Sequence, residues 1–459
     1  FCEKPIDLDI KKVTSCWAKV KKYNPNIQIG FNRRYDPSHN KVQKDVLSGK
    51  IGKLEMIVIT SRDPAPPGLD YLKVSGGIFR DCSIHDFDLA RYVLRNDPIL
   101  DIYASGSRNV SNDFKKTNDF DTTMSDAVQQ TVKKQVQSGV DIVSDGETSK
   151  ISYATYVKDR YHGFSGDSPR NAPADLKLFP GFLERLADDG GTPQYARPQC
   201  TGEVSSKGQD ELQKDISNLQ SAMKVSGVAR GFMNAASPGV ISLFLQNAYY
   251  KNREAYLAAL ADTMRQEYET IVASGLDLQL DCPDLALSRH MLFNDLSDKE
   301  FVKVAASHVD ALNHALENIP EEKVRIHICW GNYEGPHCCD IGMDKVFSTL
   351  MSAKAKYLLF ETSNPRHAHE WTVFRDRKSE IPDNKILVPG VVDTTTNFIE
   401  HPELVAQRIS RFVDIIGADR VIAGSDCGFG TFAGYGSVDP DIAYAKLKSL
   451  SEGAAIVSK

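Results

Sequence analysis

Residues 324–330, VRIHICW, combine an alternating apolar run with an imidazole and a thiol. Side chains alternate between the two faces of a β-strand, so His327 and Cys329 share one face near the end of this strand. Two ligands at this spacing can hold one metal ion. The pair is a weak signal by itself, because a hydrogen-bonded core histidine beside a buried cysteine gives the same pattern.

Two more potential ligands stand at corresponding positions of later apolar runs. Glu361 follows KYLLF (356–360), and Cys427 follows DRVIAGSD (419–426). Together with His327 and Cys329 they supply one nitrogen, one carboxylate and two sulfur donors. That is a complete tetrahedral set for Zn²⁺, with expected bonds of about 2.0–2.3 Å. The sequence therefore predicts a zinc site at these four residues.

Strands and amphipathic helices alternate from residue 123 to residue 459, and this pattern predicts the element that positions these ligands. Strands joined through helices run parallel, and their number favours a (β/α)8 TIM-type barrel, short of its first strand, over an open sheet. In such a barrel the loops at the C-terminal ends of the strands carry the chemistry. We predict strands at 139–145, 228–236, 276–281, 324–330, 356–363, 385–393 and 419–426, with 201–204 as a weak extra strand.

Residues 1–109 have a different pattern, which predicts a separate α+β domain. Three longer alternating strands are expected at 27–35, 53–63 and 98–108, with helices at 9–23 and 84–94. The polar stretch at 110–122 has no apolar periodicity and is interpreted as the junction between the two domains.

Composition restricts the class of protein. The chain has 459 residues, a net charge of -6 and 41% apolar residues. It has no basic stripe with interleaved aromatic residues, so a nucleic-acid partner is not expected. No apolar run is long enough to span a bilayer, no signal peptide is recognised, and the nine cysteines are odd in number. We therefore expect a cytoplasmic enzyme with reduced thiols, small-molecule partners and no membrane association.

The barrel part, over residues of about 118–459, resembles the catalytic barrel of cobalamin-independent methionine synthase. The wider group includes the epoxyalkane:coenzyme M transferases. The matching pieces are HIC (327–329), FETS (360–363), GSDCGFGT (424–431), SDGE (144–147) and LDCPDLA (280–286). The resemblance implies that the four predicted ligands hold zinc and that Glu147 and Asp281 bind the amino group of homocysteine.

The implied activity is methyl transfer from a methyltetrahydrofolate-like donor, 5-methyltetrahydropteroyltriglutamate, to homocysteine, which forms methionine. The family has a histidine that protonates the leaving group where this chain has Thr395, so Asp393 is the candidate acid. The alternatives are thiol alkylation of the epoxyalkane:coenzyme M type, dehydrogenation by the N-terminal part, zinc that only braces the barrel, and an inactive fusion.

The N-terminal part resembles inositol 2-dehydrogenase of the Gfo/Idh/MocA oxidoreductases, over residues 1 to about 109. GFNRRYDP (30–37) and GGIFRDCSIHDFDLARY (76–92) are the matching pieces. The resemblance implies that Lys4, Asp81 and His85 act on the proton of an alcohol. No G-x-G-x-x-G follows a predicted strand, so we predict no residue that binds a nicotinamide cofactor. This part is interpreted as a fragment of the dehydrogenase's C-terminal domain.

Overall fold

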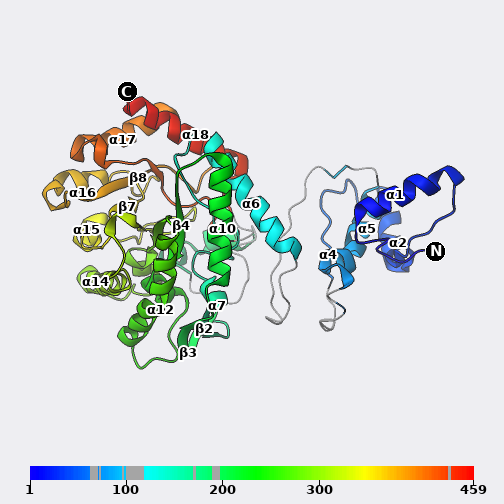
Figure 1. Cartoon of the computed structure of the whole chain (residues 1–459), viewed down its shortest axis with the longest axis horizontal. Coiled ribbons are helices and arrows are strands. Elements are labelled where there is room, and N and C mark those ends of the chain that lie inside the picture. Colours follow the sequence, from blue (N-terminus) through cyan, green and yellow to red (C-terminus); the bar gives the residue numbers. More distant parts are fainter. Residues whose placement is uncertain are drawn as a thin grey trace. The chain divides into compact units, whose positions relative to one another are not determined.

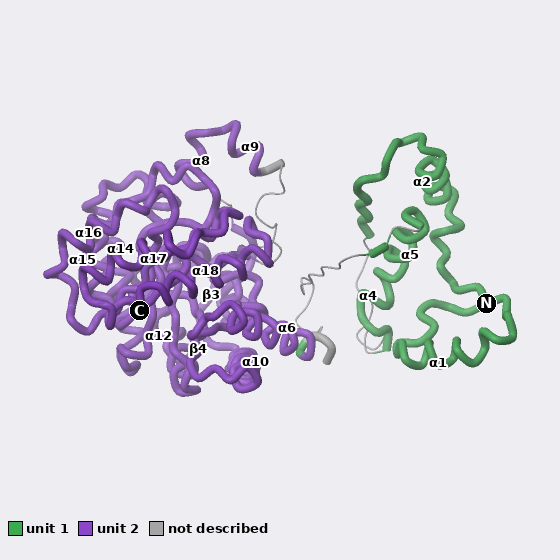
Figure 2. The backbone as a smooth tube through the Cα atoms, turned by 90° about the horizontal axis from the view of Figure 1, so that it is seen from above, with its two compact units in different colours: residues 1–121 green, residues 122–459 purple. Residues whose placement is uncertain are grey.

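The structure is a computed structural model that describes residues 1–61, 71, 74–95, 98–99, 118–168, 172–188, 197–432 and 436–459. The chain divides into two compact units, Phe1–Asp121 and Thr122–Lys459 (Figure 2). No helix in these described ranges is both long and apolar enough to cross a bilayer.

The second unit is built on a curled parallel sheet of seven strands, in the order β1-β4-β5-β6-β7-β8-β9. All six pairings are parallel, because each strand returns through at least one helix. The seven strands predicted from the sequence are therefore confirmed as members of one sheet. Their bounds are β1 Ile142–Val143, β4 Arg230–Ala236, β5 Asp277–Asp281, β6 Val324–His327, β7 Tyr357–Phe360, β8 Ile386–Val392 and β9 Gly424–Ser425.

Helices cover the outside of this sheet (Figure 1). Several begin at a side-chain cap: Ser297 and Glu300 form a reciprocal capping box at the start of α14, and the imidazole of His401 accepts from Glu403 N at α17. The helices are α6 Asn118–Gln137, α7 Val157–Arg160, α8 Ala174–Lys177, α9 Pro180–Asp188, α10 Asp210–Ser226, α11 Pro238–Phe244, α12 Arg253–Ala273, α13 Ser288–Met291, α14 Asp298–Ala315, α15 Met343–Met351, α16 Trp371–Asp376, α17 Pro402–Ile416 and α18 Pro440–Val457. Short 3-10 turns are η3 Pro283–Leu285, η4 Glu321–Lys323, η5 Lys378–Glu380 and η6 Ala418–Arg420.

The sheet has two edges within the described residues, at β1 and β9, where a closed barrel would have one more strand between them. The loops beyond these edges meet, since Ser152 and Phe432 form an isolated antiparallel bridge. On the outside, α6 contacts α18: Lys134 Nζ lies 3.7 Å from Asp441 Oδ1. The expectation of a barrel that lacks its first strand fits this arrangement.

The weak extra strand at 201–204 is real but belongs elsewhere. It lies within β3 Gln199–Ser206, which pairs antiparallel with β2 Tyr161–Ser165 in a separate two-stranded sheet. Gly163 permits the close approach of the two strands, because a Cβ there would lie 2.6 Å from Glu203 O and the residue has φ of +94°.

The first unit contains the two helices expected from the sequence, α1 Ile10–Val20 and α5 Ser83–Leu94, together with α2 Pro37–Leu47, α4 Ile78–Asp81, η1 Lys21–Tyr23 and η2 Asn32–Tyr35. The predicted strands at 27–35 and 53–63 were wrong. Of the first, only Ile29 makes a bridge, to Cys2, and residues 53–61 form no strand. A strand needs a neighbour for its backbone groups. None lies beside 53–61 in the described residues, and Met56 and Val58 stay 77% and 78% exposed. The third predicted strand lies almost wholly outside the described residues.

Candidate active site

The predicted ligands follow the C-terminal ends of neighbouring parallel strands. His327 ends β6, Glu361 comes directly after β7, and Cys427 lies two residues beyond β9. Because the strands are parallel, these ends share one edge of the sheet. Cys329, two residues beyond β6, is buried together with the other three residues.

The structure brings three of the four predicted ligands into one cluster. One donor atom each from His327, Cys329 and Cys427 lies within 4.8 Å of the others. The two sulfur atoms are 3.5 Å apart. Glu361 adjoins the cluster, with Oε1 3.6 Å from the sulfur of Cys427. Two thiols, an imidazole and an adjacent carboxylate are a donor set that suits Zn²⁺.

Burial sets the protonation of these groups in the absence of a cation. It lowers the pKa of His327 to about 4, so the imidazole is neutral and can act as a ligand. The pKa of Cys427 is raised well above its usual value by its contact with the sulfur of Cys329 and by burial. For Cys329 the hydrogen bond with Cys427 lowers the pKa, but burial and Glu361 raise it by more. The two thiols become thiolates readily only beside a positive charge.

Glu361 is held by its neighbours in the orientation that faces the sulfur atoms. Trp330 N donates to Oε1 at 2.8 Å, and Asn364 Nδ2 donates to Oε2 at 2.8 Å. The loop that carries Glu361 is fixed in turn by Asp426, which accepts from Thr362 N at 2.9 Å. Burial, together with the charge of Glu361, raises the pKa of Asp426 to about 7.

Glu147 and Asp281, the predicted amino-group ligands, lie on the same side of the sheet. Asp281 ends β5 and is the register partner of His327 on β6. Burial, with the charge of Glu147, raises the pKa of Asp281 to about 7. Asn234 Nδ2 donates to Asp281 Oδ2 at 3.3 Å.

Sequence reasoning did not identify Lys150, whose ammonium lies between these residues. Its Nζ is 3.0 Å from Glu147 Oε1 and donates to Asn234 O at 2.6 Å. Its side chain is 2% exposed, so the ion pair is well shielded from water. In the sequence, this ion pair is indicated only by the spacing of three residues between Glu147 and Lys150 in a polar turn.

Asp393, the candidate acid, lies after β8. Its Oδ1 accepts from Thr395 Oγ1 at 2.9 Å, and its Oδ2 accepts from Thr396 Oγ1 at 2.7 Å. Both oxygens thus order the turn that carries the two threonines. Asp393 is not among the mutually close donor atoms of the cluster found in the described residues.

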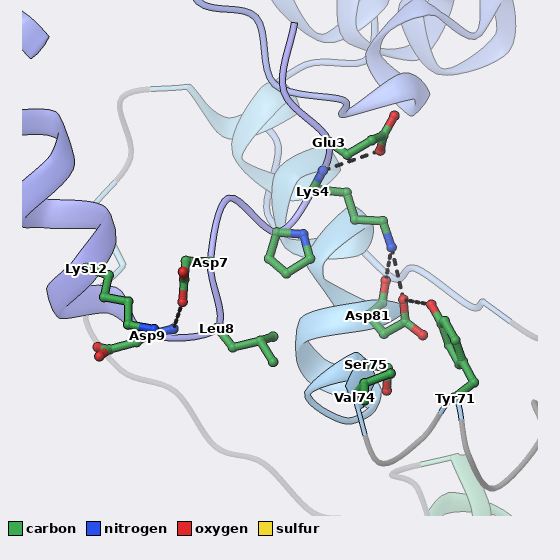
Figure 3. A pocket seen from close by; sticks show the side chains of 11 residues that line it. Glu3, Lys4, Asp7, Leu8, Asp9, Lys12, Tyr71, Val74, Ser75 and Asp81 are labelled. Atoms are coloured by element: carbon green, nitrogen blue, oxygen red, sulfur yellow. Dashed lines mark hydrogen bonds and ion pairs between the residues drawn. The ribbon is translucent and has the colours of Figure 1, made fainter.

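Two of the three residues expected from the dehydrogenase resemblance meet in the first unit. Lys4 Nζ lies 3.1 Å from Asp81 Oδ1, and Tyr71 donates to the same oxygen at 2.9 Å (Figure 3). These three line a cavity of about 860 Å³. His85 is not one of the residues that line it. Its pKa is lowered by burial and by the charge of Lys4.

A curled parallel sheet with thiols, an imidazole and a carboxylate at its C-terminal edge defines a barrel with a candidate metal-binding active site. Residues 217–438 match the family model "Cobalamin-independent synthase, Catalytic domain", and residues 39–141 match "GFO/IDH/MocA C-terminal domain". Most of the second unit is therefore similar to the catalytic domain of cobalamin-independent synthases, and the region before it is similar to the GFO/IDH/MocA C-terminal domain. The second match ends at residue 141, beyond the boundary between the two units.

The individual relatives also fall into two groups, one of inositol dehydrogenases and one of a methionine synthase and a CoM lyase. The inositol 2-dehydrogenase of Rhizobium meliloti is 39% identical over 198 residues, which are 43% of this chain and 54% of that enzyme. The methionine synthase of Saccharolobus islandicus is 25% identical over 342 residues, 74% of this chain and 86% of that protein. The 2-hydroxypropyl-CoM lyase of Xanthobacter autotrophicus is 25% identical over 362 residues, 73% of this chain and 85% of that protein.

The chain spans between about a third and about a half of the length of the first dehydrogenase relatives it matches. Among solved structures, a B12-independent methionine synthase from Shewanella sp. W3-18-1 in complex with selenomethionine has a TM-score of 0.57 and 20% identity, covering 75% of this chain and 90% of that one. This likeness concerns the fold.

Proposed function

We propose that the second unit is a zinc-dependent S-methyltransferase that transfers a methyl group to the thiol of homocysteine or a similar small thiol. The observation that carries the proposal is the set of donor atoms of His327, Cys329 and Cys427 within 4.8 Å of one another at the C-terminal edge of the sheet. The family match and the methionine synthase relative support it.

In this proposal His327, Cys329 and Cys427 hold the ion, and Glu361 fills the fourth position. Bound zinc supplies the positive charge that keeps a coordinated thiol in its nucleophilic thiolate form at neutral pH. Glu361 would be the most easily displaced of the four, because both of its oxygens also accept hydrogen bonds, from Trp330 N and Asn364 Nδ2, which would remain if it left the ion.

Asp281 and Glu147 orient the thiol substrate by binding its ammonium group. The register of β5 and β6 sets Asp281 beside His327, so one carboxylate stands next to the ligand cluster. Lys150 occupies one oxygen of Glu147 and leaves the other free for a substrate ammonium. Asp393 remains the proposed acid for the leaving group of a methyltetrahydrofolate-like donor.

Alkylation of a thiol with an anionic tail is the second candidate, and two observations favour it. One is the similarity to 2-hydroxypropyl-CoM lyase. The other is the buried ammonium of Lys150, which is a suitable partner for a sulfonate or carboxylate.

The test is a direct assay of the purified chain. Homocysteine and methyltetrahydropteroyltriglutamate are supplied in one reaction, and coenzyme M and epoxypropane in another. The proposal predicts zinc-dependent methionine formation in the first reaction. Product only in the second reaction would favour the alternative, and no product in either would contradict both.

A further inference from the structure

A second group of histidines lies near the ligand cluster but shares no residue with it. Its members follow three consecutive strands of the sheet: His290 on α13 after β5, His337 and Asp340 in the loop after β6, and His367 after β7. Donor atoms of His337, Asp340 and His367 lie within 4.8 Å of one another. The proposed methyl transfer uses none of these residues.

The hydrogen bonds of His367 determine which of its ring nitrogens faces the group. Nδ1 lies 2.9 Å from Glu370 Oε2, while Glu370 Oε1 accepts from Met343 N at 2.8 Å. A carboxylate that accepts at both oxygens takes the proton of Nδ1–H. In the neutral ring, Nε2 then presents a lone pair, and it lies 2.9 Å from Asp340 Oδ2.

His337 has the same arrangement with a backbone carbonyl in place of the glutamate. Its Nε2 lies 3.0 Å from Tyr333 O, which can only accept a hydrogen bond. Nδ1 of the neutral ring therefore also presents a lone pair, and it lies 2.9 Å from the same oxygen, Asp340 Oδ2. Two lone pairs directed at one carboxylate oxygen need either two added protons or a cation.

His290 provides an independent observation. It is 1% exposed, and among the residues that the structure describes neither of its ring nitrogens has a partner in hydrogen-bond geometry. Its Nδ1 lies 3.1 Å from Asp340 Oδ1, which also lacks a hydrogen bond. A buried imidazole without a hydrogen bond lowers the stability of the folded state. A metal ion bound between His290 Nδ1 and Asp340 Oδ1 would give each of these two atoms a partner.

We propose that His290, His337, His367 and Asp340 form a second divalent-metal site of the zinc class. Three imidazoles and one carboxylate complete a tetrahedral set. Ligands around zinc lie roughly 3.3 Å from one another. The donor atoms of His337, Asp340 and His367 already lie within 4.8 Å of one another, whereas His290 contacts only Asp340 of the three and would have to move toward the other two to complete the set. Glu370 and the carbonyl of Tyr333 orient two of the rings from behind, as partners of metal-bound histidines do.

An ion in this second site would stabilise the residues that surround the first cluster. The ring of Trp330 packs on that of His367 with centroids 4.4 Å apart, and Trp330 N donates to Glu361. The loop that carries His337 and Asp340 also contains Asn332, which donates to Gly428 O at 2.7 Å. An ion at this position would therefore help to fix the loop that contacts the residue after Cys427.

Metal analysis of the full chain tests the proposal, after saturation with Zn²⁺ and removal of loosely bound ions. We expect about two zinc ions per wild-type chain and about one in His367→Ala. His369→Ala is the matched control, because His369 is exposed two residues away, and it should keep the wild-type content. Equal zinc in His367→Ala and wild type would overturn the second site.

Cobalt spectroscopy separates the two sites and does not depend on the folding of His367→Ala. In Cys427→Ser loaded with Co²⁺, the second site predicts tetrahedral d–d absorption with little sulfur-to-metal charge transfer, and His337→Asn in the same background should remove it. Absence of that absorption in soluble Cys427→Ser would contradict the second site. Its presence in Cys427→Ser, together with a wild-type chain whose first cluster shows no sulfur-to-metal charge transfer, would refute only the proposed function.

Discussion

Two sulfur atoms 3.5 Å apart, with a buried neutral imidazole beside them, are the residues on which the proposed chemistry depends. Without a cation, burial keeps both thiols protonated, so the cluster gains most from an ion that favours sulfur. A zinc ion also replaces the weak contact between the two thiols with two strong bonds.

Cys427→Ser tests the ligand assignment at this scale. We expect zinc affinity at the first cluster to fall by more than about 100-fold, because a serine hydroxyl is not deprotonated by zinc as a thiol is. Competition with a chelator of known affinity measures the change. Cys16→Ser, which alters an exposed cysteine of the first unit, is the control. Undiminished affinity in folded Cys427→Ser would rule Cys427 out as a ligand.

Asp281 should make stability depend on pH. Its pKa is raised from 3.8 to about 7 by burial and by Glu147, so the folded state holds a proton that the unfolded chain releases between these values. Stability due to this group is therefore complete below about pH 4 and decreases as the pH rises toward 7.

Asp281→Asn removes that dependence. Relative to wild type, the variant should gain about 1–3 kcal/mol in free energy of unfolding between about pH 5 and pH 8. Urea unfolding at each pH, with a chelator present in both samples, measures the difference. A difference that stays constant over this range would contradict the assignment of the raised pKa to Asp281.

At the scale of elements, the close approach of β8 and β9 positions Cys427. A Cβ on Gly390 would lie 2.1 Å from Asp426 Oδ1 and 2.6 Å from Asp426 Cα. Asp426 in turn holds the loop after β7 that carries Glu361. One glycine on β8 thus lets the segments after β7 and β9, on either side of it, bring Glu361 and Cys427 to the same point.

Gly390→Ala should lower the free energy of unfolding by about 2–4 kcal/mol and reduce zinc retention, because backbone atoms of β9 must move. Gly181→Ala is the control, since a Cβ at Gly181 on α9 meets nothing within 4 Å, and it should change stability by less than about 1 kcal/mol. Urea unfolding and metal analysis of both variants give the comparison. Wild-type stability in Gly390→Ala would mean that β8 and β9 can separate at little cost.

The elements also explain which parts of the molecule could be predicted. The seven strands were predictable because each lies in a short, mainly apolar run between amphipathic helices, and the first cluster was predictable because the strand ends converge. The strands expected at 27–35 and 53–63 were not, because alternation indicates a strand only where another strand can pair with it. The group around Asp340 comes from loops far apart in sequence, and no local pattern connects His290 with His367. The ion pair of Lys150 with Glu147 is local, but a spacing of three in a polar turn does not by itself indicate a buried ammonium.

At the scale of the whole molecule, the chain joins a unit similar to a synthase catalytic domain to a region similar to a dehydrogenase C-terminal domain. The first unit retains Lys4 and Asp81 in contact beside a cavity, but no glycine-rich phosphate-binding motif follows a predicted strand in the sequence. We propose that the chemistry of the chain lies in the second unit, where the donor atoms of His327, Cys329 and Cys427 meet.

This assignment predicts that the full chain does not bind NADH at concentrations that saturate complete dehydrogenases. Titration followed by NADH fluorescence measures binding, with a complete inositol dehydrogenase as the positive control. Saturable enhancement that Lys4→Ala abolishes would show that the first unit keeps a nucleotide site.

The most direct test of the central claim is zinc-edge X-ray absorption of the purified chain before and after addition of homocysteine, with Cys427→Ser measured alongside. We predict that homocysteine adds about one sulfur ligand per chain to the wild-type zinc spectrum and none to that of Cys427→Ser. A wild-type spectrum that homocysteine leaves unchanged would contradict the claim that this site binds and activates a thiol.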